Sequence, residues 1–163
     1  MERGIPRLLV IGVGNLYRGD DAAGVLAARQ LKNAGGESFS VLEHSGEGAS
    51  LMETWKGADA VILMDAVSSG SPPGTIHRLE PARQPLPARM FQNSTHAFSL
   101  PQAIEMARAL DDLPAAVIVF GIEGRDFQAG TELSPEVSNA LPELVRRVLE
   151  EAANIQNAFE DGD

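Results

Sequence analysis

Two carboxylates and one imidazole in this sequence are of the types that bind a divalent cation. Asp21 lies in the first turn of a predicted helix, Asp65 directly follows an apolar strand, and His96 precedes another predicted helix. Carboxylate oxygens and imidazole nitrogens together suit several divalent metals. Because the three residues are far apart in the sequence, they form a site only if the fold brings three loops to one edge.

Each of these residues also has a purely structural interpretation. Asp20, next to Asp21, is predicted to be the N-cap that accepts the first free backbone N–H groups of the helix. Asp21 could then serve only to complement the helix dipole. Asp65 could be a hydrogen-bonded buried acid, since a carboxylate after an apolar strand needs a partner. His96 could likewise be a helix-capping histidine.

Other catalytic chemistries have less support in the sequence. The chain has no cysteine, which excludes thiol nucleophiles, thiolate metal ligands and disulfides. It has no G-x-S-x-G nucleophile elbow, and Ser45, Ser94 and Ser99 lack a local context that would activate them. His44 and His77 are weaker candidates than His96, and His77 is expected at the surface of an edge strand.

The stretch from Gly12 to Gly24, GVGNLYRGDDAAG, also suggests a nucleotide-binding loop. The dinucleotide fingerprint needs a third glycine where Tyr17 stands, although Glu43 could supply its ribose-binding acid. The phosphate would lie at a helix N-terminus that carries Asp20 and Asp21, and like charges there weaken binding. A Rossmann-like nucleotide-binding module therefore stays as the less favoured alternative.

The elements that must position these residues alternate between strand and helix. Strands are predicted over residues 7–13, 39–43, 58–64, 75–79 and 115–122, and helices over 20–34, 49–55, 98–110 and 134–153. The fourth strand follows the third too closely for a parallel crossover, so it should run antiparallel. The pattern predicts a three-layer α/β/α sandwich, in which ligands bind at the carboxyl ends of the strands. All three candidate residues fall at that edge, together with Asn15, Glu123, Arg125 and Asp126.

Several helix limits follow from local signals. The glycines at 35–36 should end the first long helix, and Ser134 with Pro135 should begin the last one. The polar tail at 157–163 is expected to fray. The helix over 98–110 is expected to bury Ile104, Met106, Ala107 and Leu110.

Length and charge limit the class of protein. With 163 residues, the chain fits a single domain over 1–163. The net charge of −10 argues against nucleic acid and anionic membrane as partners. No apolar run reaches the roughly 18 residues of a membrane span. The N-terminus, MERGIPRLLVIGVG, lacks the pattern of a signal peptide, so the expected location is the cytoplasm.

Four motifs, in this order, resemble those of the hydrogenase maturation proteases. They are GVGNLYRGDDAAG, AVILMDA with GSPPGT after it, STHAFSL, and GIEGRDFQAGTELSPEV, and the resemblance runs from about Leu8 to Leu149. It implies a phosphorylase/hydrolase-like fold with a five-stranded mixed sheet in the order 2-1-3-5-4, strand 4 being antiparallel. It also implies that Asp21, Asp65 and His96 are the metal-contacting and catalytic residues.

The activity implied by this resemblance is that of an endopeptidase. It would remove the C-terminal peptide of a nickel–iron hydrogenase large-subunit precursor, its partner, after nickel insertion. The nickel would be presented by the precursor and not tightly bound by the isolated protein. Either Asp21 or Asp65 could be the general base, with nickel as Lewis acid or water activator. A metal-checking chaperone that does not cut is a further alternative.

The sequence departs from the family pattern in places. Asp21 stands where many relatives carry glutamate, and Ser99 stands where the S-P-H-x-x-G-L form has glycine. The stretch EHSGEG, at 43–48, replaces a D-x-G-T-x-G stretch of some relatives. These loops are expected to face the substrate, so the departures bear on the choice of hydrogenase more than on the class of activity.

Overall fold

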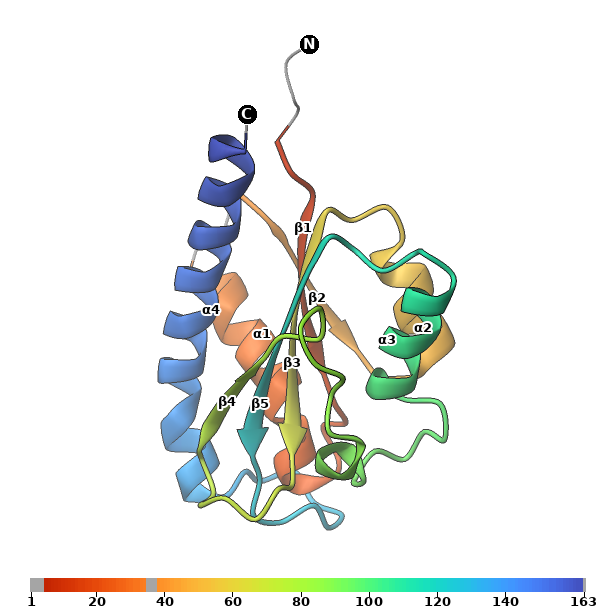
Figure 1. Ribbon diagram of the computed structural model, residues 1–163. Helices are drawn as coiled ribbons and strands as arrows, with labels where there is room; N and C mark the ends of the chain where they lie inside the picture. The colour runs from red at the N-terminus through yellow and green to blue at the C-terminus, as the bar shows by residue number, and fades with distance from the viewer. Residues whose placement is uncertain (1–4, 35–37, 163) are drawn as a thin grey trace.

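The fold is built on one five-stranded sheet, shown in Figure 1 as a computed structural model that describes residues 5–34 and 38–162. The strands lie in the order β2-β1-β3-β5-β4. Their bounds are Leu8–Val13 for β1, Ser40–His44 for β2, Ala60–Val67 for β3, Ile76–Leu79 for β4 and Ala116–Glu123 for β5. Four strands are parallel and β4 runs antiparallel to β5. The predicted strand order and the antiparallel fourth strand are confirmed.

Helices cover both faces of the sheet. The α-helices are α1 (Ala23–Asn33), α2 (Gly48–Trp55), α3 (Leu100–Ala109) and α4 (Pro135–Asp161), and two short 3₁₀ helices are η1 (Gly19–Ala22) and η2 (Ala88–Phe91). Helices α1 and α4 pack on one face, and α2 and α3 on the other (Figure 1). Every residue of β3 is buried, as expected of a parallel strand that is covered on both sides.

Glycines set the close approach of α1 to the sheet. A Cβ on Gly12 would collide with the carbonyl oxygen of Gly24, and a Cβ on Gly24 would collide with the backbone of Val13 and Met64. A Cβ on Gly14 would likewise meet the carbonyl oxygen of Asp21. The glycine-rich turn therefore permits backbone-to-backbone packing and draws η1 against the ends of β1 and β3.

Some predicted boundaries are wrong. The helix predicted over 20–34 begins as η1, and α1 starts only at Ala23. The third strand was predicted to end before Asp65, but β3 continues to Val67 and includes it. The predicted glycine stop at 35–36 lies outside the described residues.

The last helix is longer than predicted. Instead of ending at residue 153 with a frayed tail after 156, α4 continues to Asp161. Its apolar spacing continues too, because Ile155 is buried and Phe159 packs against the same core. No helix of the described residues is both long enough and apolar enough to cross a membrane.

The buried face of α3 is only partly the predicted one. Ile104 and Ala107 are buried, but Met106 is 45% exposed and Leu110 is 56% exposed. The face that contacts the sheet is set by Leu100, Ala103, Ile104 and Ala107, which recur at the helical spacing. Met106 lies outside that face, and Leu110 follows the end of α3 at Ala109.

Candidate functional site

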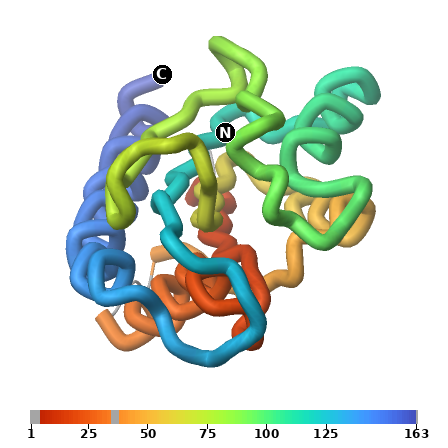
Figure 2. Tube along the Cα trace, turned by 90° about the horizontal axis from the view of Figure 1, so that it is seen from below, coloured from red at the N-terminus to blue at the C-terminus, as the bar shows by residue number. Residues whose placement is uncertain are grey.

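A small pocket at the carboxyl edge of the sheet is lined by Asp21, Asp65 and His96. Figure 2 looks onto this edge, where the turn after β1 is surrounded by the loops after β3 and β5 and by the segment before α3. Asp21 comes from η1, Asp65 from β3, and His96 from the segment between η2 and α3. The space inside is about 20 Å³, enough for one water molecule or a small ion.

Asp65 is the most deeply placed of the three. Its residue is 9% exposed, inside a strand whose other members are all buried. Burial raises the pKa of Asp65 well above its usual range, and the nearby charge of Asp21 raises it further, while the Ala66 backbone N–H acts in the opposite direction. The pocket therefore disfavours a bare negative charge at Asp65 and favours either a proton or a cation there.

Asp21 is half-buried and shares the same electrostatic environment. Burial raises its pKa, while the positive charge of Arg18, the Asn15 backbone N–H and the His96 side chain lower it. Burial raises the pKa of both carboxylates, and the charge of Asp21 raises that of Asp65 further, so a divalent cation between them would favour their ionised forms. The chemistry of the pocket thus suits a positively charged ligand.

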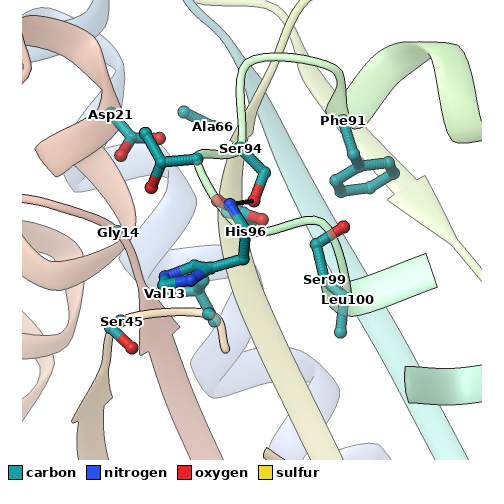
Figure 3. Close-up of a pocket in the computed structure, with 13 residues that line it drawn as sticks. Val13, Gly14, Asp21, Ser45, Ala66, Phe91, Ser94, His96, Ser99 and Leu100 are labelled. Carbon is teal, nitrogen blue, oxygen red and sulfur yellow. Dashed lines mark hydrogen bonds between the residues drawn. The ribbon is translucent and has the colours of Figure 1, made fainter. Parts of the chain in front are cut away.

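His96 presents its ring to the pocket. Its backbone N–H donates a hydrogen bond to Ser94 Oγ at 3.2 Å, which holds the backbone at this position (Figure 3). Within residues 5–34 and 38–162, no hydrogen-bond partner occupies either ring nitrogen. The imidazole is therefore free to bind a ligand.

The three side chains do not make a complete metal site by themselves. In the part of the chain that the structure describes, no three His, Asp or Glu side chains are placed to hold one metal ion. All three side chains nevertheless line one pocket, and their role in contacting a metal stays a prediction. Holding an ion here would take further ligands.

Asp20 is not the helix N-cap that its position predicted. Its carboxylate accepts hydrogen bonds from the backbone N–H groups of Arg125 (2.7 Å), Asp126 (2.9 Å) and Ser134 (2.7 Å), and from Ser134 Oγ (2.7 Å). Burial raises the pKa of Asp20, but these bonds outweigh it and leave the pKa lowered. Asp20 therefore anchors the segment between β5 and α4 to η1.

Glu123 also has a structural role at this edge. It is 2% exposed and accepts from the backbone N–H groups of Ser69 (2.7 Å) and Gly70 (3.0 Å) and from Ser69 Oγ (2.8 Å). His77 Nε2 lies 3.3 Å from the same carboxylate, and its side chain is only 21% exposed. The expectation of a surface histidine at 77 is wrong, because β4 pairs His77 with Gly121, two residues from Glu123 on β5.

Other predicted edge residues also have local partners. Asn15 Oδ1 accepts from the Tyr17 N–H at 2.9 Å, and Asp126 Oδ1 accepts from the Gln128 N–H at 2.9 Å. The Arg125 guanidinium pairs with Glu136 at 3.0 Å. These side chains shape the loops, and none of them lines the pocket.

Three serines line the pocket without having been predicted there, namely Ser45, Ser94 and Ser99. Ser45 Oγ accepts from the Glu47 N–H at 3.4 Å, and Ser99 Oγ donates to Gln102 Oε1 at 2.8 Å. Among the described residues, none of the three hydroxyls contacts a histidine ring. The geometry therefore offers no serine nucleophile with an adjacent base, in agreement with the sequence.

His44 is held as a structural residue. Its Nδ1 accepts from the Gly46 N–H at 2.9 Å, and its Nε2 lies 2.9 Å from Ser50 Oγ. Burial lowers the pKa of His44, so the neutral ring is favoured, with its proton on Nε2.

A wider groove adjoins the pocket. Its volume is about 460 Å³, and one wall is formed by Asn15, Leu16 and Tyr17. Residues 43–45 and Thr95 also line the groove. His96 lines both the groove and the pocket, so the two are continuous. An extended ligand in the groove would reach the two carboxylates.

Comparison with known proteins gives one consistent result. The family model described as "Hydrogenase maturation protease" matches residues 25–151. The hydrogenase expression/formation protein HupD of Thiocapsa roseopersicina is 29% identical over 151 residues, which are 91% of this chain and 68% of that protein. The hydrogenase 2 maturation protease of Escherichia coli is 26% identical over 148 residues, 88% of each chain.

Solved structures agree in fold. The hydrogenase maturating endopeptidase HybD from E. coli superimposes with a TM-score of 0.77 at 24% identity, over 91% of this chain and 93% of that one. A second endopeptidase structure from E. coli has a TM-score of 0.77 at 26% identity, over 88% and 90% of the two chains.

Proposed function

The chain belongs to the hydrogenase maturation protease family, and on this premise we propose that it removes the C-terminal peptide of a nickel–iron hydrogenase large-subunit precursor after nickel insertion. The observation that carries the proposal is the pocket at the sheet edge, which Asp21, Asp65 and His96 line. Its two interacting carboxylates and free imidazole suit a cation that arrives already held by another protein.

In this proposal the nickel belongs to the substrate. The precursor docks with the ion at the pocket, and the side chains of Asp21 and His96 add ligands to it. The ion then polarises the scissile carbonyl or a water molecule. We assign the role of general base to Asp65, because burial and the charge of Asp21 raise its pKa well above the usual range and so make its carboxylate a stronger base.

The glycine-rich turn gives the nucleotide-binding alternative little support. The glycines at 12, 14 and 24 are required by backbone packing. The start of the following helix is occupied by Asp20, whose carboxylate is already bonded to the 125–134 segment. A phosphate would meet negative charge in place of free N–H groups.

Incubation of the purified protein with a nickel-loaded large-subunit precursor from the same organism tests the proposal. A large subunit shortened at its C-terminus, seen by intact-mass spectrometry, is the expected result. Binding of the precursor without shortening would instead identify a metal-checking chaperone. Stabilisation by nucleotides without shortening would identify a nucleotide-binding module.

A further inference from the structure

Strand β2 leaves one edge of the sheet open. The Gly14 N–H donates to the His44 carbonyl at 3.0 Å, so the backbone of His44 faces β1. Backbone groups of successive strand residues point to alternate sides, so Leu42 also faces β1, while Val41 and Glu43 face outward. No described residue forms a hydrogen bond with the backbone groups of Val41 or Glu43. These two residues therefore present free N–H and C=O groups along the edge.

This open edge leads directly into the candidate site. β2 ends at His44, and the next two residues, Ser45 and Gly46, line the pocket. Glu43 and His44 themselves line the adjoining groove. The other edge strand, β4, contributes no residue to the pocket or to the groove. Of the two sheet edges, that of β2 is the one that adjoins the pocket and the groove.

The surroundings of the edge leave room for a peptide. Leu42 on β2 is 36% exposed, and Tyr17, which lines the groove, is 72% exposed. The Glu43 side chain is drawn aside by ion pairs with Arg29 at 3.0 Å and Lys32 at 3.5 Å, both on α1. The side chain of Glu43 therefore points toward α1 and away from the outward N–H and C=O groups of its own backbone. The exposed side chains of Leu42 and Tyr17 are available to contact those of a bound strand.

We propose that the precursor segment that is cut away binds as an additional strand on the free edge of β2. This inference rests on the proposed function, because it takes the segment's own scissile bond to lie at the pocket. The removed segment follows that bond, so it runs away from the pocket, whereas β2 runs toward it. The added strand is therefore antiparallel to β2, and the N–H and C=O groups of Val41 and Glu43 pair with it.

Amide hydrogen exchange measured residue by residue tests the pairing. The Asp65→Asn chain, which keeps β2 unchanged and is expected not to cut, is mixed with saturating nickel-loaded precursor. The amides of Val41 and Glu43 are expected to exchange at least about tenfold more slowly in the complex, because a new hydrogen bond protects them. The Leu42 amide, already bonded to β1, serves as internal control and should change little.

Two substitutions at one position provide an independent test. Val41→Pro removes the outward N–H without removing a bond to β1, a place where an edge strand tolerates proline. Val41→Ala keeps the N–H and loses only the side chain. The proline chain is expected to process nickel-loaded precursor with a kcat/KM roughly tenfold lower than the alanine chain, as the loss of one backbone hydrogen bond predicts. Thermal unfolding checks that both chains fold, and the exchange measurement decides if the proline chain does not.

The outcomes separate this inference from the proposed function. Equal processing by the two Val41 variants, or unchanged exchange at Val41 and Glu43 in the bound complex, overturns strand addition while proteolysis stands. Protection of both amides by a precursor that the unaltered chain never shortens upholds strand addition and overturns proteolysis. If the precursor neither protects these amides nor is shortened, both strand addition and proteolysis are overturned.

Discussion

The Asp65→Asn chain is expected to lose precursor processing and, at neutral pH, to be more stable than the unaltered chain. Asparagine has nearly the same shape as aspartate but carries no charge and cannot accept a proton from water. In the proposed mechanism this removes the general base, so processing should fall by at least about a hundredfold. The free energy of unfolding should rise, because the buried carboxylate of Asp65 destabilises the folded state at neutral pH.

The sign follows from the pKa of Asp65. Burial and the Asp21 charge raise that pKa in the folded chain, so the folded state binds the proton more tightly than the unfolded state. Folding stability therefore falls as the pH rises from the ordinary aspartate pKa through the raised one. The Asn variant should gain about 1–3 kcal/mol in the free energy of unfolding at neutral pH, the typical cost of a poorly satisfied buried group. The gain should shrink to near zero at pH 4 and below.

Urea unfolding at neutral pH and near pH 4, together with a processing assay, measures both effects. Asp112→Asn, at an exposed position, is the matched control and should change neither quantity. His96→Ala should also abolish processing, but it should leave stability within about 0.5 kcal/mol, because the ring has no hydrogen-bond partner in the described structure. Processing by Asp65→Asn at the rate of the unaltered chain would remove this residue from the mechanism.

The Asp20→Ala chain is expected to lose about 3–4 kcal/mol in the free energy of unfolding. A lost N-cap costs only about 1 kcal/mol. Asp20, however, accepts three backbone N–H groups and one hydroxyl, and it is fully buried. Alanine would leave these donors without a protein acceptor, and each unpaired buried group costs about 1–3 kcal/mol unless water reaches it.

The pH dependence of this effect has the opposite sign to that of Asp65. The pKa of Asp20 is lowered in the folded chain, so its contribution is present above the ordinary aspartate pKa and is lost as the pH falls through the lowered one. The difference between Asp20→Ala and the unaltered chain should therefore narrow in acid. Urea unfolding across this range measures it.

Asp20→Asn is the matched control, since its amide oxygen keeps one acceptor and part of the stability. In chains shown to be folded, Asp20→Ala should reduce processing less than Asp21→Ala does, because only Asp21 lines the pocket. A loss of about 1 kcal/mol or less would return Asp20 to the role of a simple cap. A reversed ranking in processing would mean that the roles of the two acids are exchanged.

The strands and the antiparallel direction of β4 were predictable from local signals, whereas the strand order was implied by the family resemblance. Continuous apolar runs such as residues 60–64 indicate buried parallel strands, and the short connection between β3 and β4 excludes a parallel return. The same reasoning placed Asp21, Asp65 and His96 at one edge, where the structure finds them lining one pocket.

Residue roles set by distant partners were not predictable. Asp20 and the residues that donate to it are separated by more than a hundred positions, so a helix start offered only the cap interpretation. His77 looked exposed because its partner, Glu123, lies on a strand that comes later in the chain. His96 lies in the irregular segment between η2 and α3, and strand and helix patterns do not specify the course of such a segment.

The most direct test of nickel sensing compares two forms of the same precursor. Metal-free enzyme is incubated with nickel-loaded and with empty large-subunit precursor, and the mass of the large subunit is followed with time. If the pocket acts only on an ion that the substrate presents, the nickel-loaded precursor is shortened and the empty one stays intact. Equal shortening of both precursors would contradict nickel sensing.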